Sequence, residues 1–187
     1  MTEEIGLFLS TAPRSGSTDG GLLAACQQGD LKAFENLYST HASRMKSIAF
    51  QLLSDRRDAE DAVQETFLRI YRGCASLDGE SAFVPWMYRI LLNCCYDAGR
   101  KRKQQSESEM VEEPAGSSPL PIQLAVKNAL SRIHSGYRTV FWLFEAEGFR
   151  HSEIAAMLEI PEGTSRKWLF EAKRELKRLL MGARHDI

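Results

Sequence analysis

The sequence Phe-Val-Pro-Trp-Met-Tyr-Arg-Ile-Leu-Leu-Asn-Cys-Cys-Tyr-Asp-Ala-Gly-Arg-Lys-Arg-Lys, residues 83–103, predicts one long helix with an unusual mixture of side chains. Pro85 fits the first turn of a helix, where the missing N–H has no helical partner to lose. Aromatic and polar residues are distributed along the stretch, which ends in four consecutive cations, Arg100 to Lys103. Aromatic rings stack on bases and cations neutralise phosphates. The stretch therefore indicates a surface that binds a nucleic acid.

The residues before this stretch predict further helices of the same bundle. Asp30 is a suitable N-cap for a helix whose apolar residues recur at intervals of three and four as far as Leu53. A second helix is expected to begin near Asp58 and to end at Gly73. Together with the stretch above, these helices predict one all-helical domain over residues 21–103.

Two segments lack the periodicity of a packed helix. Residues 1–20 are rich in Ser, Thr, Gly and Pro and predict a mobile N-terminal tail. Residues 104–119 contain Pro, Gly, Ser and four Glu without any cation, which predicts a flexible linker. Beyond this linker, residues 120–187 regain helical periodicity and form a second domain.

The second domain contains the pattern of a helix-turn-helix. Ser152 is expected to cap a short helix, Pro-Glu-Gly at 161–163 to form a turn, and Thr164 or Ser165 to begin a last helix that runs to about Met181. No segment shows the alternation of a strand. The predicted fold class is therefore all-α, with two small helical domains joined by a flexible linker.

The last helix separates an apolar side from a polar side when its residues are placed at about 100° each. On the polar side, Arg and Lys can contact guanine edges or phosphates, Glu can accept from cytosine, and an aromatic ring can pack on a thymine methyl. The candidate residues for reading duplex DNA are Arg166, Lys167, Phe170, Glu171 and Arg174. The alternative is that the cations of this helix only form a solvated face. This alternative would be preferred if the short helix and the turn did not precede it.

Composition and charge restrict the class of protein. The 187 residues are 43% hydrophobic with a net charge of −1, but residues 166–187 hold seven Lys or Arg against three acids, so separate surfaces for separate partners are expected. The four cysteines lack a CxxC spacing and the four histidines do not cluster with acids, so reduced thiols, no metal, no cofactor and no catalytic centre are expected. No run is long enough to span a membrane and no signal peptide is evident, which predicts a cytoplasmic protein without membrane insertion.

Three motifs, in this order, resemble the bacterial extracytoplasmic-function (ECF) sigma factors of the sigma-70 family. They are Asp58-Ala-Glu-Asp-Ala-Val-Gln-Glu-Thr-Phe67, then Trp86-Met-Tyr-Arg-Ile-Leu-Leu-Asn93 with Asp97 and Arg100, and then the stretch 149–164. The resemblance extends over nearly all of residues 21–181. It implies a sigma region 2-like bundle in the first domain and a sigma region 4-like helix-turn-helix in the second.

The resemblance implies a dissociable subunit, not an enzyme, that directs core RNA polymerase to specific promoters and assists promoter opening. The first motif resembles the helix that docks on the clamp of the largest polymerase subunit, and its matching positions are Asp61, Gln64 and Glu65. Asp61 and Glu65 are four residues apart and share a helical face. The acids of this motif also favour the positive end of their own helix, and the two interpretations are compatible.

The second and third motifs resemble the segments that capture the single-stranded −10 element and read the −35 duplex. The candidate −10 residues are Tyr88, Arg89, Asn93, Asp97, Arg100, Lys101 and Arg102. Trp168 and Glu171 stand where the family commonly has arginine, so a different −35 sequence is expected. Gly99 is a weak helix former and predicts a loosened helix at that point.

The implied partners are core RNA polymerase, promoter DNA in duplex and single-stranded form, and an anti-sigma protein, as in a stress response. Two other functions stay open. A helix-turn-helix regulator would bind its operator without polymerase, and a sigma-like interaction module would bind a protein without supporting transcription.

Overall fold

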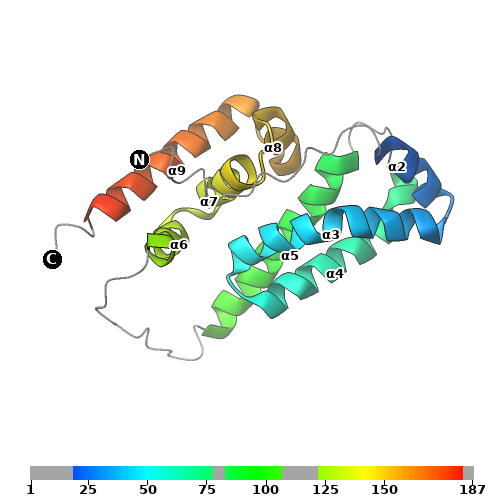
Figure 1. Ribbon diagram of the computed structural model, residues 1–187, viewed down its shortest axis with the longest axis horizontal. Coiled ribbons are helices and arrows are strands. Elements are labelled where there is room, and N and C mark those ends of the chain that lie inside the picture. The colour runs from blue at the N-terminus through cyan, green and yellow to red at the C-terminus, as the bar shows by residue number, and fades with distance from the viewer. Residues whose placement is uncertain (1–18, 78–82, 107–121, 183–187) are drawn as a thin grey trace.

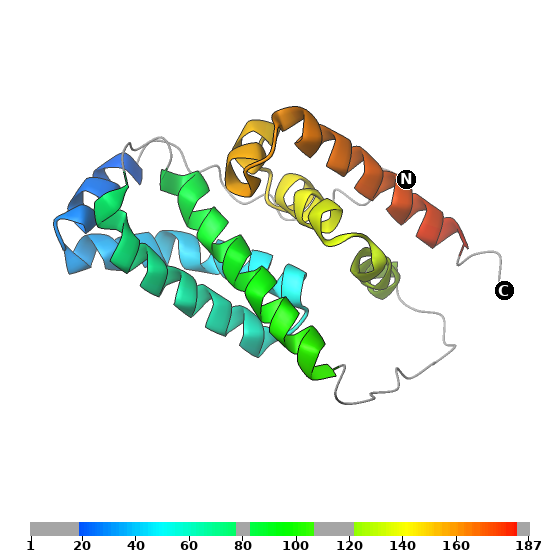
Figure 2. The same cartoon turned by 180° about the vertical axis from the view of Figure 1, so that it is seen from behind.

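The computed structural model describes residues 19–77, 83–106 and 122–182, and every regular element in these ranges is helical. The helices form two bundles that lie side by side, as Figure 1 shows. The view from behind in Figure 2 shows α5 (Phe83–Ser106, green) and α8 (His151–Leu158) where the two bundles meet. Within the described ranges, no helix combines the length and apolar character needed to cross a membrane.

The first bundle consists of three long helices and two short ones. Its elements are α2 (Asp19–Gln27), α3 (Leu31–Leu53), α4 (Arg56–Gly73), the 3₁₀ turn η1 (Cys74–Ser76) and α5 (Phe83–Ser106). The helices α3, α4 and α5 pack against one another and α2 packs on α3. Their shared core includes Leu37, Met45, Ile70 and Leu91, each with no exposed surface. Burying a side chain of this size stabilises a fold by roughly 1.5–3 kcal/mol.

Local capping fixes where these helices begin. Asp30 accepts hydrogen bonds from the N–H groups of Lys32 (2.9 Å) and Ala33 (3.4 Å), which confirms the predicted start of α3. The start of α4 was predicted too late, because the carboxylate of Asp55 accepts from the N–H of Asp58 at 3.0 Å and the helix begins at Arg56. That hydrogen bond also lowers the pKa of Asp55.

The long helix α5 continues without a break through Gly99, so the predicted loosening there was wrong. A Cβ at Gly99 would lie 3.9 Å from Leu53, which shows that α3 supports this part of α5. The guanidinium of Arg102 donates to the carbonyl of Leu53 at 3.2 Å and adds a second tie between the same helices. The helix ends at Ser106, within the segment 104–119 that was predicted to be a linker.

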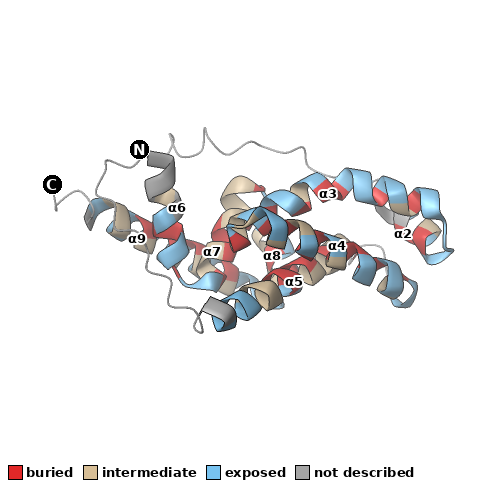
Figure 3. Cartoon of the chain, turned by 90° about the horizontal axis from the view of Figure 1, so that it is seen from below, coloured by how far each residue is buried: buried red, intermediate tan, exposed pale blue. Residues whose placement is uncertain are grey.

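The second bundle consists of α6 (Ile122–Arg132), α7 (Ser135–Phe141), the π-helical segment η3 (Trp142–Ala146), α8 (His151–Leu158) and α9 (Glu162–Gly182). Figure 3 shows buried positions gathered on the facing sides of these helices and exposed positions on the outside of α9. In the π-helical turn, the N–H of Glu147 donates to the carbonyl of Trp142 at 3.1 Å. The turn ends at Gly148, which has a positive φ of 69°.

Two predicted boundaries in the helix-turn-helix were wrong. Ser152 lies inside α8, whose N-cap is Arg150, because the Arg150 N–H donates to the carboxylate of Glu153 at 2.6 Å. The last helix begins at Glu162, two residues before Thr164, because the carbonyl of Pro161 already accepts the N–H groups of the first turn. The turn itself depends on Glu159, whose φ is 55°.

Candidate nucleic-acid interface

One face of α4 carries the candidate polymerase-binding residues. Asp61 and Gln64 are exposed, and Glu65 is half-exposed and paired with Arg69 at 2.7 Å. This hydrogen bond raises the pKa of Arg69 and holds the carboxylate of Glu65 along the helix. One turn further on, Leu68 and Tyr71 are about half-exposed at 49% and 50%. The face therefore offers acids beside apolar side chains, a combination that fits a basic surface with an apolar centre.

The candidate −10 residues of α5 do not share one face. Arg89, Asn93 and Asp97 are spaced by four residues and form one stripe, in which Asn93 is exposed. Tyr88 lies about 140° around the helix from Asn93 and points toward the core. It has no exposed surface, and its ring packs edge-on against Phe149 of the second bundle at a centroid distance of 5.0 Å.

Arg89 also contacts the second bundle. Its Nη1 donates to the carboxylate of Glu159 at 2.6 Å, and its Nη2 donates to the carbonyl of Ala156 at 2.7 Å. Both acceptors lie at the C-terminal end of α8, where the helix dipole is negative. The guanidinium of Arg89 is thus held by acceptors of the same kind that a phosphate would offer.

Two cations at the basic end of α5 form ion pairs within the first bundle. Arg100 pairs with Asp97, and Arg102 lies 3.6 Å from the carboxylate of Asp58. Lys101 is exposed. Since these side chains lie at the surface and their ion pairs are weak, a phosphate backbone can compete for them.

The outer face of α9 presents most of the candidate −35 residues to solvent, with Glu171 as the exception. Arg166 and Lys167 are exposed, and Phe170 is 63% exposed although it is a large apolar side chain. Glu171 is mostly covered and holds Arg174 at 2.5 Å, so it positions that guanidinium along the face.

Trp168 points the other way and packs on α7. Its ring lies 5.9 Å from that of Tyr137, and a Cβ at Gly136 would lie only 2.8 Å from its Cζ3. The joint between α8 and α9 is fixed by His151, whose Nδ1 lies 2.9 Å from the buried Ser165 hydroxyl and whose ring stacks on Phe144. These contacts hold α9 on its bundle.

Arg44, Glu147 and Phe149 join the two bundles and were not predicted from the sequence. Arg44 Nε lies 3.0 Å from Glu147 Oε2, a second guanidinium nitrogen donates to the Glu147 carbonyl, and the guanidinium lies 3.9 Å from the centroid of the Phe149 ring. Arg44 and Glu147 are 103 residues apart, and neither stands in a motif. No local pattern in the sequence could have paired them.

Two family models and several curated relatives match the chain along most of its length. The model described as Sigma-70 region 2 matches residues 37–105, and the model described as Sigma-70, region 4 matches residues 123–176. The ECF RNA polymerase sigma-E factor of Haemophilus influenzae is 30% identical over 86% of this chain and 94% of its own length. The chain belongs to the ECF sigma factors. The ECF RNA polymerase sigma factor SigM of Mycobacterium tuberculosis is also 30% identical, over 87% of this sigma factor and 85% of its own length.

Solved structures share the fold of this sigma factor. CnrH, solved in complex with the cytosolic domain of CnrY, has a TM-score of 0.72 at 24% identity and covers 88% of this chain and 97% of its own. The sigma factor RpoE of Bartonella quintana, solved in complex with the anti-sigma factor NepR, has a TM-score of 0.65 at 26% identity and covers 81% of this chain and 98% of its own.

Proposed function

We propose that this sigma factor docks on core RNA polymerase through α4 and directs it to promoters through α5 and α9. The observation that carries the proposal is the separation of three chemically distinct surfaces on one chain. These surfaces are the acidic face with Asp61, Gln64 and Glu65, the stripe of α5 that contains Asn93, and the exposed basic face of α9. Their order matches the region 2 and region 4 models.

The surface on α5 is assigned to the −10 strand because its chemistry fits unpaired bases. Removing a base from the duplex costs a few kcal/mol, part of which stacking and base-edge hydrogen bonds return. Asn93 is exposed and can both donate and accept. Arg89, Asp97 and Arg100 lie along the same stripe, and Lys101 adds an exposed cation near its end. Arg102 lies about 180° around the helix from Asn93, beside Leu53 and Asp58, and is assigned to the phosphate backbone only. Tyr88 belongs to this assignment only when the second bundle has moved away from it.

The surface on α9 is assigned to the −35 duplex because a rigid helix with exposed cations fits the major groove. Arg166, Lys167 and Arg174 contact guanine edges or phosphates, and Phe170 packs on a thymine methyl. Glu171 orients Arg174, which makes the preferred sequence depend on a residue that does not itself face the groove.

Reconstitution with core RNA polymerase and a promoter library, read as run-off transcripts, tests this function. The wild-type protein is expected to produce transcripts from a restricted set of sequences, and core enzyme without it is not. The double variant Gln64→Ala with Glu65→Ala is expected to lose polymerase binding while keeping its circular dichroism spectrum. The matched control is Glu35→Ala with Asn36→Ala, which removes an acid and an amide from exposed positions on α3. Equal loss in both variants would contradict the docking assignment.

We also propose an anti-sigma protein as a second partner. Large apolar side chains are exposed on α3 and α4, among them Leu31, Tyr38, Leu68 and Tyr71. Their exposure beside the acidic face favours a protein that covers both the apolar and the charged positions. Competition between such a protein and core polymerase, measured by native gel shift, tests this: Leu68→Ser with Tyr71→Ser is expected to weaken both complexes.

A further inference from the structure

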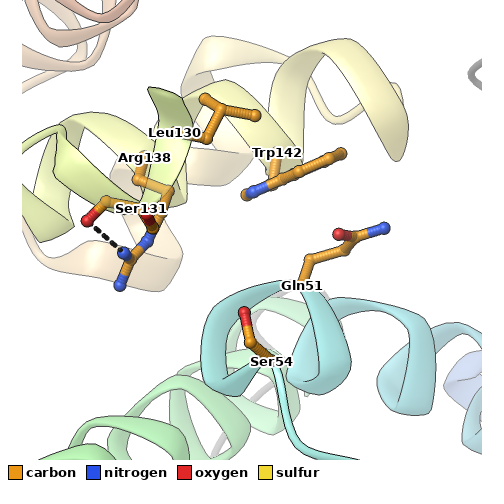
Figure 4. Close-up of a pocket in the computed structure, with 6 residues that line it drawn as sticks. All are labelled: Gln51, Ser54, Leu130, Ser131, Arg138 and Trp142. Carbon is orange, nitrogen blue, oxygen red and sulfur yellow. Dashed lines mark hydrogen bonds between the residues drawn. The ribbon is translucent and has the colours of Figure 1, made fainter. Parts of the chain in front are cut away.

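A small pocket lies between the end of α3 and the α6–α7 segment. Its lining residues are Gln51, Ser54, Leu130, Ser131, Arg138 and Trp142. Figure 4 shows the guanidinium of Arg138, the indole nitrogen of Trp142 and the hydroxyl of Ser54 around the same space. The cavity has a volume of about 10 Å³, and a cavity of this size has room for roughly one water-sized atom.

The pocket contains two buried hydrogen-bond donors, the Nε of Arg138 and the Nε1 of Trp142. Neither has a hydrogen-bond partner among the residues that the structure describes. Both groups can donate but cannot accept, so a partner for them must be an acceptor. Because buried polar groups are almost always hydrogen-bonded, an additional acceptor is expected in this pocket.

Arg138 also brings a positive charge that no carboxylate within the described ranges balances. Its Nη1 donates to the carbonyl of Ser131 at a long 3.4 Å, and none of the ion pairs in these ranges includes it. Asp55, next to the lining residue Ser54, accepts from the N–H of Asp58 and caps α4 instead. Burial lowers the pKa of Arg138, as expected for a cation with few compensating groups. A negative charge in the pocket would compensate this cation.

Size and charge together favour an anion of a single atom. Sulfate, phosphate and carboxylate groups have several heavy atoms and exceed a cavity of about 10 Å³. A water molecule fits, but it is neutral, and its own hydrogens need acceptors on a side where Arg138 and Trp142 only donate. Chloride fits in size, accepts from several donors at once and supplies the negative charge. The hydroxyl of Ser54 and the amide of Gln51 can donate to it as well.

We propose that this pocket binds one chloride ion, held by Arg138 and Trp142 of the second bundle and by Ser54 and Gln51 of the first. The ion is shared by donors of both bundles, so it adds an electrostatic link between α3 and the α6–α7 segment. None of its four donor residues belongs to the polymerase-binding or DNA-binding residues proposed above. The proposal is therefore independent of the proposed function.

NMR spectra of the full-length protein with isotope-labelled tryptophan test the proposal. The chain contains three tryptophans, so Trp86 and Trp168 supply internal controls for Trp142 in the same spectra. Sodium chloride replaces sodium gluconate stepwise at constant ionic strength, and substituting each tryptophan by phenylalanine assigns the indole N–H signals. The variant Arg138→Gln removes the charge and keeps an amide donor. The matched control is Arg132→Gln, which removes an exposed cation from α6.

The indole N–H signal of Trp142 is expected to shift saturably with chloride, while those of Trp86 and Trp168 do not. Arg138→Gln is expected to weaken chloride binding by roughly ten-fold or more, because a charge-assisted hydrogen bond is lost, and Arg132→Gln is expected to bind chloride as the wild type does. If the wild-type signal of Trp142 shows no saturable shift, the pocket holds water only and the proposal is overturned. An equal saturable shift with sodium sulfate would overturn the assignment to an ion of a single atom.

Discussion

Gly136 on α7 leaves room for Trp168 on α9, and substituting it should destabilise the second bundle. A Cβ at this position would lie 2.8 Å from Cζ3 and 3.2 Å from both Cε3 and Cη2 of the indole ring. The ring is packed against Tyr137 and cannot give way without moving that contact. Overpacking of this kind costs about 1–3 kcal/mol.

The helix propensity of alanine opposes this cost. Alanine is favoured over glycine in a helix interior by up to about 1 kcal/mol, and less in the first turn, where Gly136 lies. The net loss expected for Gly136→Ala is therefore about 1–2 kcal/mol, which corresponds to a fall in Tm of roughly 4–16 °C for a bundle of this size.

A matched substitution should have the opposite sign. Gly163 lies in the first turn of α9, and a Cβ there would meet no heavy atom within 4 Å, so Gly163→Ala gains propensity without a clash. It is expected to stabilise by a few tenths of a kcal/mol up to about 1 kcal/mol. Urea unfolding, followed by circular dichroism and tryptophan fluorescence, measures both variants.

An equal change in the free energy of unfolding for the two substitutions would refute this reasoning. If Gly136→Ala is as stable as Gly163→Ala, α7 and α9 do not approach as closely as the structure shows. Replacing Trp168 by Leu in the Gly136→Ala background supplies a further check, because the smaller side chain should remove most of the penalty and give a coupling energy of about 1 kcal/mol or more.

Three further outcomes are expected. Asp30→Ala should destabilise the first bundle by about 1 kcal/mol in urea unfolding, since Asp30 caps α3, whereas an unchanged midpoint would show that the cap contributes nothing. Burial and the nearby cations lower the pKa of His151 in the folded protein. The free energy of unfolding therefore keeps its full value above about pH 6.5, the pKa of an unfolded histidine, and falls as the pH drops from there through the lower folded pKa. In thermal melts, the Tm of His151→Gln should lose this decrease at acid pH. Burial raises the pKa of the Cys95 thiol to about 12, so its alkylation by iodoacetamide at pH 8 should wait for unfolding, and rapid reaction in the native protein would contradict the packing around it.

The sequence predicted those features of the fold that depend on neighbouring residues. Asp30 followed by an apolar periodicity is a local signal, and the structure has the cap and the helix in the expected place. The region 2 and region 4 assignment was also accessible, because each motif lies within a short stretch. The predicted loosening at Gly99 was wrong because it considered only the low helix propensity of glycine. The packing of α5 against Leu53 depends on a residue that is distant in the sequence.

The boundaries and contacts that were missed depend on residues without a distinctive local pattern. Glu159 adopts the left-handed conformation where glycine would have been the visible signal, and the π-helical turn before Glu147 has no recognisable composition. The pairing of Arg44 with Glu147 spans 103 residues and needs the three-dimensional arrangement. The covering of Tyr88 by Phe149 was missed for the same reason.

The unbroken course of α5 sets a fixed length within the molecule. A helix of 24 residues measures about 36 Å, close to the rise of about ten base pairs. Under the proposed function, DNA groups that contact α5 near Phe83 and near Ser106 are therefore held at a constant separation. Any adjustment to promoters of different spacing then takes place outside α5, because a continuous helix does not change its length.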